Sequence, residues 1–219
     1  ALSLDGRPDD HRRHRLPHGS DTDAYEHVMT LLPELLRSRR VVVTQTIAPD
    51  LAEAAAANFE HLWELGFRRF NLLPAYYLAW QPEQVAALES SFGAIGERIR
   101  ERWAAGQPLY LKNLYTSAPT ALFNTGLVVD SDRSIHASNV GLASSYQDLL
   151  GATRVGDLNS PPSRAALRAR AEQMPDLILA RVPEPVWRAT LAVDEALGKL
   201  CRGLYGDYVS YKRRRREVA

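Results

Sequence analysis

Hydrophobic and polar positions follow a regular alternation along the first half of the chain. Short apolar or β-branched runs, typical of buried strands, occupy residues 2–4, 41–47 and 67–73. Apolar residues spaced three and four apart predict helices over residues 24–37, 51–65 and 82–103. We expect Asp50 to cap the second of these helices. Strands and helices joined by short links predict parallel β/α units, with a sheet covered on both faces.

The pattern changes after residue 106. A short strand is expected within 109–114, a β-hairpin over 127–136, a loop with one short helix over 139–162, and helices over 163–173 and 184–205. The basic run Lys212–Arg216 is expected to fray. The predicted fold class is therefore α/β. An incomplete parallel (β/α) barrel over residues 1–106 is followed by a small α+β extension, with a hairpin and C-terminal helices, over residues 107–219.

Composition narrows the classes of function. The chain is 45% hydrophobic and 24% charged, which is a globular profile, and no apolar run approaches the roughly 20 residues that cross a bilayer. The net charge of +1 gives no general attraction to nucleic acid, so we expect neither a membrane nor a specific nucleic-acid partner. Cys201 is the single cysteine, which excludes an internal disulfide and any site built on several thiolates of this chain. This cysteine usage predicts a cytoplasmic location.

Four polar residues lie near the carboxyl ends of predicted strands: Ser3, Asp5, Thr44 and Asn71. Ser3 and Asp5 alternate along one strand and therefore share a face. The carboxyl ends of parallel strands meet at one edge, where β/α folds bind ligands. We expect the four side chains to converge there, although an ordinary turn at Asp5-Gly6 remains the alternative.

Several motifs follow one another in an order that resembles a known family. Ser3-Leu4-Asp5-Gly6 is followed by His11 and Arg15, and Glu64-Leu-Gly-Phe67 precedes a strand. Together they resemble radical SAM enzymes of the sulfatase-maturase and peptide-maturase kind. The resemblance covers residues 1–105 and extends weakly to Leu127–Ser138, which is similar to the hairpin of the SPASM extension.

The resemblance implies a partial (β/α)6 barrel in a parent enzyme that binds a [4Fe–4S] cluster and S-adenosylmethionine (AdoMet). Such an enzyme cleaves AdoMet reductively and modifies a substrate, here a peptide or protein. It also implies that Ser3, Asp5, Thr44 and Asn71 lie at the cofactor. The family's Cys-x3-Cys-x2-Cys loop is missing from the sequence, so the resemblance places the cluster-binding part before residue 1, or on a partner subunit. In the extension, Ser138 stands near the position where an auxiliary-cluster cysteine is expected. Because the cluster cysteines are missing, we expect no metal ligands in this chain and no activity of this chain by itself.

The main alternative is a β/α binding or partner subunit that has no cluster and recognises a peptide through the hairpin and the C-terminal helices. A metal site formed by His11, His14 and His18 is less favoured than a solvated basic loop, because several arginines lie among them. Lys212–Arg216 could contact RNA or another anionic surface, but a solubilising tail is the simpler interpretation.

Overall fold

The computed structural model describes residues 1–16, 23–115, 125–142 and 144–217. Contacts divide the chain into two units. One consists of Ala1–Ser117 together with Arg188–Ala219, and the other is Ala118–Trp187. The sequence-based division at residue 106 separates a barrel part from an extension, and it stays a prediction.

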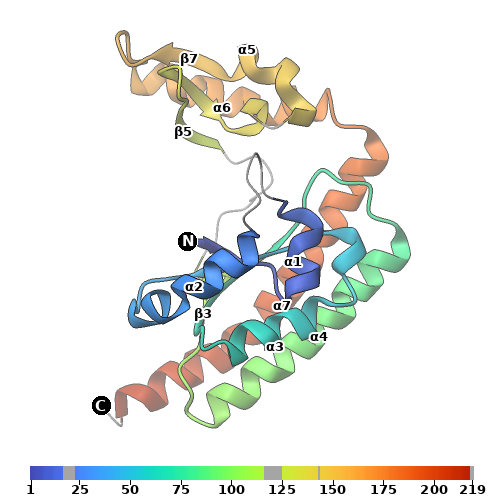
Figure 1. Cartoon of the computed structure of the whole chain (residues 1–219). Coiled ribbons are helices and arrows are strands. Elements are labelled where there is room, and N and C mark those ends of the chain that lie inside the picture. Colours follow the sequence, from blue (N-terminus) through green and yellow to red (C-terminus); the bar gives the residue numbers. More distant parts are fainter. Residues whose placement is uncertain (17–22, 116–124, 143, 218–219) are drawn as a thin grey trace. The chain divides into compact units, whose positions relative to one another are not determined.

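A parallel sheet of four strands, in the order β1-β2-β3-β4, forms the centre of the first unit (Figure 1). The strands are β1 Leu2–Ser3, β2 Val43–Ile47, β3 Arg69–Pro74 and β4 Tyr110–Leu111. Each neighbouring pair is parallel, and the register places Ser3 opposite Thr44 and Thr44 opposite Asn71. The predicted parallel β/α arrangement is confirmed.

Helices connect and cover these strands. They are α1 Pro8–His14, α2 Ala24–Arg37, α3 Ala55–Glu64, α4 Pro82–Ala104 and the long α7 Glu184–Glu217. Figure 1 shows α7 running beside α4 in the first unit, where Lys199 pairs with Glu89 at 2.7 Å. No described helix is long and apolar enough to cross a membrane.

Side chains alternate between the two faces of this sheet. One face is fully buried and carries Leu4, Val43, Gln45, Ile47, Phe70 and Leu72. It packs against α3 and α4, with the rings of Phe59 and Phe70 4.7 Å apart. Polar residues of β1, β2 and β3 occupy the other face, which is only partly covered. The apolar face supplies the core and leaves the polar face available for function.

Three expectations for the first unit were wrong. The sheet was expected to be covered on both faces, but the face that carries Ser3, Thr44 and Asn71 is only partly covered. The His- and Arg-rich connection expected as a loop contains helix α1, because Pro8 suits the first turn, acidic residues follow it, and basic residues occupy the last turn. The helix expected over 51–65 begins only at Ala55, after a 3-10 turn at Pro49–Leu51. Asp50 lies in that turn and caps no helix; its carboxylate pairs with His14 at 2.9 Å.

The second unit is built on an antiparallel sheet in the order β5-β6-β7. Its elements are β5 Thr125–Val129, β6 Ser134–Ser138, β7 Arg154–Asp157, α5 Leu150–Thr153 and α6 Arg164–Leu179, with 3-10 segments at Val140–Leu142 and Ser144–Leu149. The predicted hairpin is confirmed, and Arg133 in its turn has a φ of 72°. Strand β7 lies where a loop was expected, because its sequence Arg-Val-Gly-Asp has no apolar alternation.

The C-terminal basic run was expected to fray but continues α7 to Glu217. Aromatic contacts to the body of the unit stabilise these last turns. The rings of Tyr208 and Tyr211 lie 5.7 and 5.6 Å from that of Trp103. A helix held by buried aromatic rings does not unravel as a solvated tail would.

The turn after β1 requires glycine, and this generates a stability prediction. Gly6 has a φ of 146°, and a Cβ there would lie 2.2 Å from Cγ of Asn58. Asn58 is fixed because its Oδ1 accepts the N–H of Arg7 at 3.0 Å. We expect Gly6→Ala to lower the free energy of unfolding by about 1–3 kcal/mol, measured by urea denaturation.

The matched control for this variant is Gly93→Ala, inside α4, where an added Cβ meets nothing within 4 Å. Alanine is the better helix former, so this control should keep or raise stability, by up to about 1 kcal/mol. Equal stability of Gly6→Ala and the unaltered chain would contradict the assigned turn geometry.

Candidate functional site

A row of polar side chains crosses three strands on the partly covered face of the sheet. The parallel register brings together Ser3 of β1, Thr44 of β2 and Asn71 of β3. Nδ2 of Asn71 donates to Oγ1 of Thr44 at 3.4 Å. Ser3 is exposed, and Thr44 and Asn71 are half-buried, so a ligand above this face could reach all three.

Asp5 lies just beyond this row and is held in a network of the protein's own groups. Its side chain is only 3% exposed. Oδ1 accepts the backbone N–H of Thr46 at 2.9 Å, and Arg15 donates to both carboxylate oxygens, at 2.8 and 3.2 Å. The carboxylate therefore ties the end of β1 to β2 and to the connection after α1.

Arg15 brings a cation to the carboxyl edge of the sheet. Besides Asp5, its guanidinium donates to Oγ1 of Thr46 at 3.2 Å, and its side chain remains 34% exposed. Arg15 belongs to the motif that begins at Ser3, but its pairing with Asp5 was not predicted. In the sequence, this pairing is indicated only by an arginine that follows an Asp-Gly turn. The position of that arginine in space depends on helix α1, which was not predicted.

His11 of α1 is the further member of the hydrogen-bond network around Asp5. It is 1% exposed, and its Nδ1 accepts the backbone N–H of Asp5 at 3.2 Å. Burial lowers the pKa of His11, and nearby arginines add to this, against the raising effect of the Asp5 carboxylate. An acceptor role at Nδ1 requires the neutral imidazole, in agreement with the direction of this shift.

Two further residues at this edge hold the scaffold. Asn113 was not predicted from the sequence. Its Oδ1 accepts the N–H of Leu72 and its Nδ2 donates to the Leu72 carbonyl, each at 2.9 Å, so hydrogen bonding to β3 continues past the end of β4. The hydroxyl of Tyr76 donates to Asp194 of α7 at 2.9 Å, and burial raises the pKa of Tyr76. Tyr76 thus fixes the loop after β3 to α7.

Metal ligands are not brought together in the described part of the chain. No group of three or more His, Cys, Asp or Glu side chains there could hold an ion. His14 contacts Asp50, and His18 lies outside the described residues. Burial in α7 raises the pKa of Cys201 to about 11, so this thiol stays protonated at neutral pH.

The hairpin of the second unit carries hydroxyl and imidazole groups in a buried chain of hydrogen bonds. Ser134 Oγ and Thr153 Oγ1 contact the two ring nitrogens of His136 at 2.7 and 2.8 Å. Ser138 is fully buried, and its Oγ accepts the N–H of Val140 at 3.2 Å. At the position expected near an auxiliary-cluster cysteine, the side chain is therefore a hydroxyl that supports the backbone.

The fold matches solved structures of anSMEcpe, a radical SAM maturase. Native anSMEcpe with bound AdoMet aligns with a TM-score of 0.58 and 16% identity, over 79% of this chain and 51% of that chain. Native anSMEcpe with bound AdoMet and Kp18Cys peptide aligns with a TM-score of 0.57, also at 16% identity, over the same shares. No protein-family model and no curated protein sequence matches the chain. The predicted resemblance is confirmed at the level of the fold, and the chain spans about half the length of the solved chains.

Burial of neutral His11 predicts a pH-dependent stability. Its pKa is lowered from 6.5 in the folded state, so the unfolded chain takes up the proton first as the pH falls. The contribution of neutral His11 to the free energy of unfolding should therefore be fully present above about pH 6.5. Below that pH it should decline, by at most about 1.4 kcal/mol per pH unit for one proton.

The variant His11→Gln should reduce this decline in urea titrations between neutral and acidic pH. His61, whose pKa burial also lowers, would remain as a second source of it. The control His27→Gln, at an exposed position of α2, should leave the decline unchanged. The same decline in both variants would exclude His11 as its source.

Proposed function

We propose that this chain is part of a radical SAM enzyme and that its sheet forms a segment of the AdoMet-binding barrel. The observation that carries the proposal is the parallel register that brings Ser3, Thr44 and Asn71 into one row on the partly covered face. The likeness to anSMEcpe with bound AdoMet supports it at the level of the fold. Binding at the carboxyl edge of parallel strands is the usual arrangement for β/α folds.

The row offers groups that suit AdoMet. The Ser3 and Thr44 hydroxyls and the Asn71 amide would donate to and accept from the hydroxyl, carboxylate and ring-nitrogen groups of the cofactor. Asp5 and Arg15 would act as positioning residues that hold the end of β1 beside β2. Bound AdoMet would supply radical chemistry, of the kind that removes a hydrogen atom from a substrate. A peptide or protein substrate is proposed because anSMEcpe has been solved with the Kp18Cys peptide.

The residues of this chain do not fit a [4Fe–4S] cluster. Such clusters are held by about four ligands, mostly cysteine thiolates, and Cys201 is the single cysteine, half-buried on α7 with a raised pKa. In this proposal the cluster ligands come from protein outside these 219 residues, and this chain performs no cleavage by itself.

This assignment predicts the outcome of cluster reconstitution. Anaerobic treatment of the chain with iron and sulfide should yield far less than one cluster per chain, by iron analysis and visible absorbance. The variant Cys201→Ser should give the same background, because that thiol is not a ligand. Stoichiometric iron with cluster absorbance would contradict the ligand assignment.

Binding of AdoMet to the row can be tested with the chain labelled with ¹⁵N. Addition of AdoMet should shift the amide signals of Ser3, Asp5, Thr44, Thr46 and Asn71 and leave those of α6 in place. Asn71→Leu should weaken binding by about two- to tenfold, the cost of one lost hydrogen bond. Thr30→Val, at an exposed site on α2, should not change it.

The alternative is a binding or partner subunit without a cluster, which would recognise a peptide through the hairpin and C-terminal helices. Its motivating observation is the single cysteine. If AdoMet causes no shifts in the strand signals while a peptide shifts signals of β5, β6 and α6, this alternative replaces the barrel proposal.

A further inference from the structure

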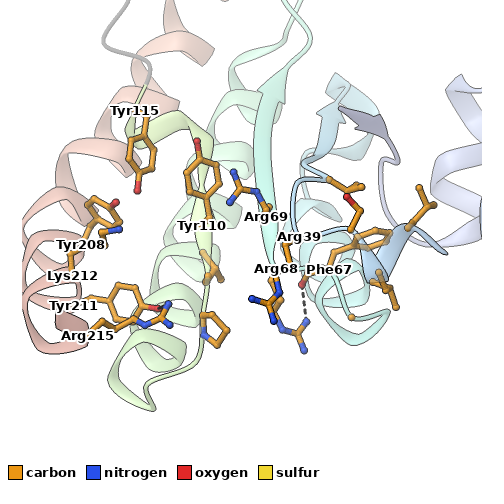
Figure 2. Close-up of a pocket in the computed structure, with 17 residues that line it drawn as sticks. Arg39, Phe67, Arg68, Arg69, Tyr110, Tyr115, Tyr208, Tyr211, Lys212 and Arg215 are labelled. Atoms are coloured by element: carbon orange, nitrogen blue, oxygen red, sulfur yellow. Dashed lines mark hydrogen bonds between the residues drawn. The ribbon is translucent and has the colours of Figure 1, made fainter. Parts of the chain in front are cut away.

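A basic cavity lies at the amino ends of β3 and β4, at the opposite edge of the sheet from Asp5 and Arg15. Its volume is about 630 Å³, and it is lined by the end of α2, the starts of β3 and β4 and the last turns of α7 (Figure 2). This volume falls in the range of small-molecule sites, roughly 300–1,000 Å³. All of the lining residues belong to the first unit.

The charge of the lining is one-sided. It contains five cations and no carboxylate: Arg39, Arg68, Arg69, Lys212 and Arg215. The described partners of these cations are aromatic rings, a tyrosine hydroxyl and backbone carbonyls. The Arg69 guanidinium lies 3.9 Å from the Tyr110 ring centre, for example, and Arg68 donates to the carbonyl of Phe67 at 2.7 Å. Like charges gathered without an anion repel one another, so this cavity suits an anionic ligand.

Arg69 carries a hydrogen-bond donor that no described group of the protein satisfies. Its Nε is buried and has no hydrogen-bond partner among the described residues. Figure 2 shows its guanidinium beside Tyr110 on the cavity wall, across from Tyr208 and Lys212. A buried donor without an acceptor costs free energy, and an acceptor on a bound ligand would remove that cost.

The cavity lining also offers flat aromatic surface. The rings of Tyr110 and Tyr115 stack at 4.8 Å, and Tyr115 contacts Tyr208 edge-on at 5.4 Å. Tyr115 remains 47% exposed. Leu35, Leu36, Val41 and Leu109 add apolar surface to the same cavity. The site therefore combines several cations with a place for one planar, weakly polar group.

We propose that this cavity binds a nucleotide through its polyphosphate and its base. Arginine guanidinium groups match phosphate oxygens in pairs, and tyrosine rings accept a stacked base. An acidic peptide would satisfy the charge, but it has no ring for the aromatic wall and would need a longer groove. A free nucleotide and the terminal nucleotide of a single-stranded nucleic acid present the same chemistry.

The experiment measures fluorescence anisotropy of a fluorescent ATP analogue with the full chain. ATP should displace the probe, and should do so at lower concentration than inorganic triphosphate, because the base contributes. A short single-stranded oligonucleotide that displaces the probe better than ATP would support the site and identify its source as a nucleic-acid end. Equal displacement by triphosphate or by a glutamate-rich peptide, or no saturable binding, would overturn the proposal.

Helix α7 supplies a matched pair of variants. Lys212→Gln/Arg215→Gln removes two cations that line the cavity, whereas Arg213→Gln/Arg214→Gln removes two exposed cations of the same turn that do not. We expect the first pair to weaken probe binding at least about tenfold and the second less than about twofold. Equal losses would identify general attraction to a basic helix and overturn the proposal. Thermal melts test whether both double variants fold. If the Lys212→Gln/Arg215→Gln variant does not fold, Arg39→Gln, at an exposed position of the cavity lining, replaces it.

Discussion

The carboxylate of Asp5 is the group on which the carboxyl edge of the sheet depends. It follows a strand of only two residues, and so short a strand cannot hold its place by ladder hydrogen bonds alone. The bonds from the Thr46 N–H and from Arg15 add a charged connection between β1, β2 and the segment after α1. A buried carboxylate without a cation would cost several kcal/mol, about 3–5 in fully buried cases, and less here because Arg15 is one-third exposed. This network sets the register that aligns Ser3 with Thr44.

The same register separates the two roles of the sheet. Val43, Ile47 and Phe70 pack against helices, and their burial stabilises the unit. Their neighbours Thr44 and Asn71 fall on the opposite face because side chains alternate along a strand. A slip of one residue would place the polar row in the core and the apolar residues on the open face, so stability and the candidate site select the same register.

The sequence predicted this part well because its signals are local. The β-branched run of β2 and the apolar spacing of α2 and α4 each carry enough information in adjacent residues to identify the element, and Ala24–Arg37 agrees with its expected bounds. The parallel strand order was also predictable, because strands that alternate with helices pair in parallel. Helix α1 and strand β7 were missed because their sequences are short and polar, and their stability comes from contacts distant in the sequence. The prediction that Asp50 caps a helix was wrong because a 3-10 turn at Pro49–Leu51 delays the start of α3. No residue pattern in this segment predicted that turn.

Contacts distant in sequence also explain why the basic cavity could not be predicted. Its cations come from the turn after α2, from the start of β3 and from the last turns of α7, and the net charge of +1 conceals their clustering. The Lys212–Arg216 run was interpreted as a solubilising tail because a run of cations at a chain end is usually solvated. Tyr208 and Tyr211 change that interpretation, because their packing on Trp103 holds the run as helix. Lys212 and Arg215 consequently line the same cavity as Arg68 and Arg69. The two edges of the sheet thus differ in electrostatics. At the carboxyl edge the charged groups Asp5 and Arg15 neutralise each other and leave neutral polar groups for a ligand, whereas at the amino edge the cations lack carboxylates among the described residues, and a bound anion would supply the missing charge.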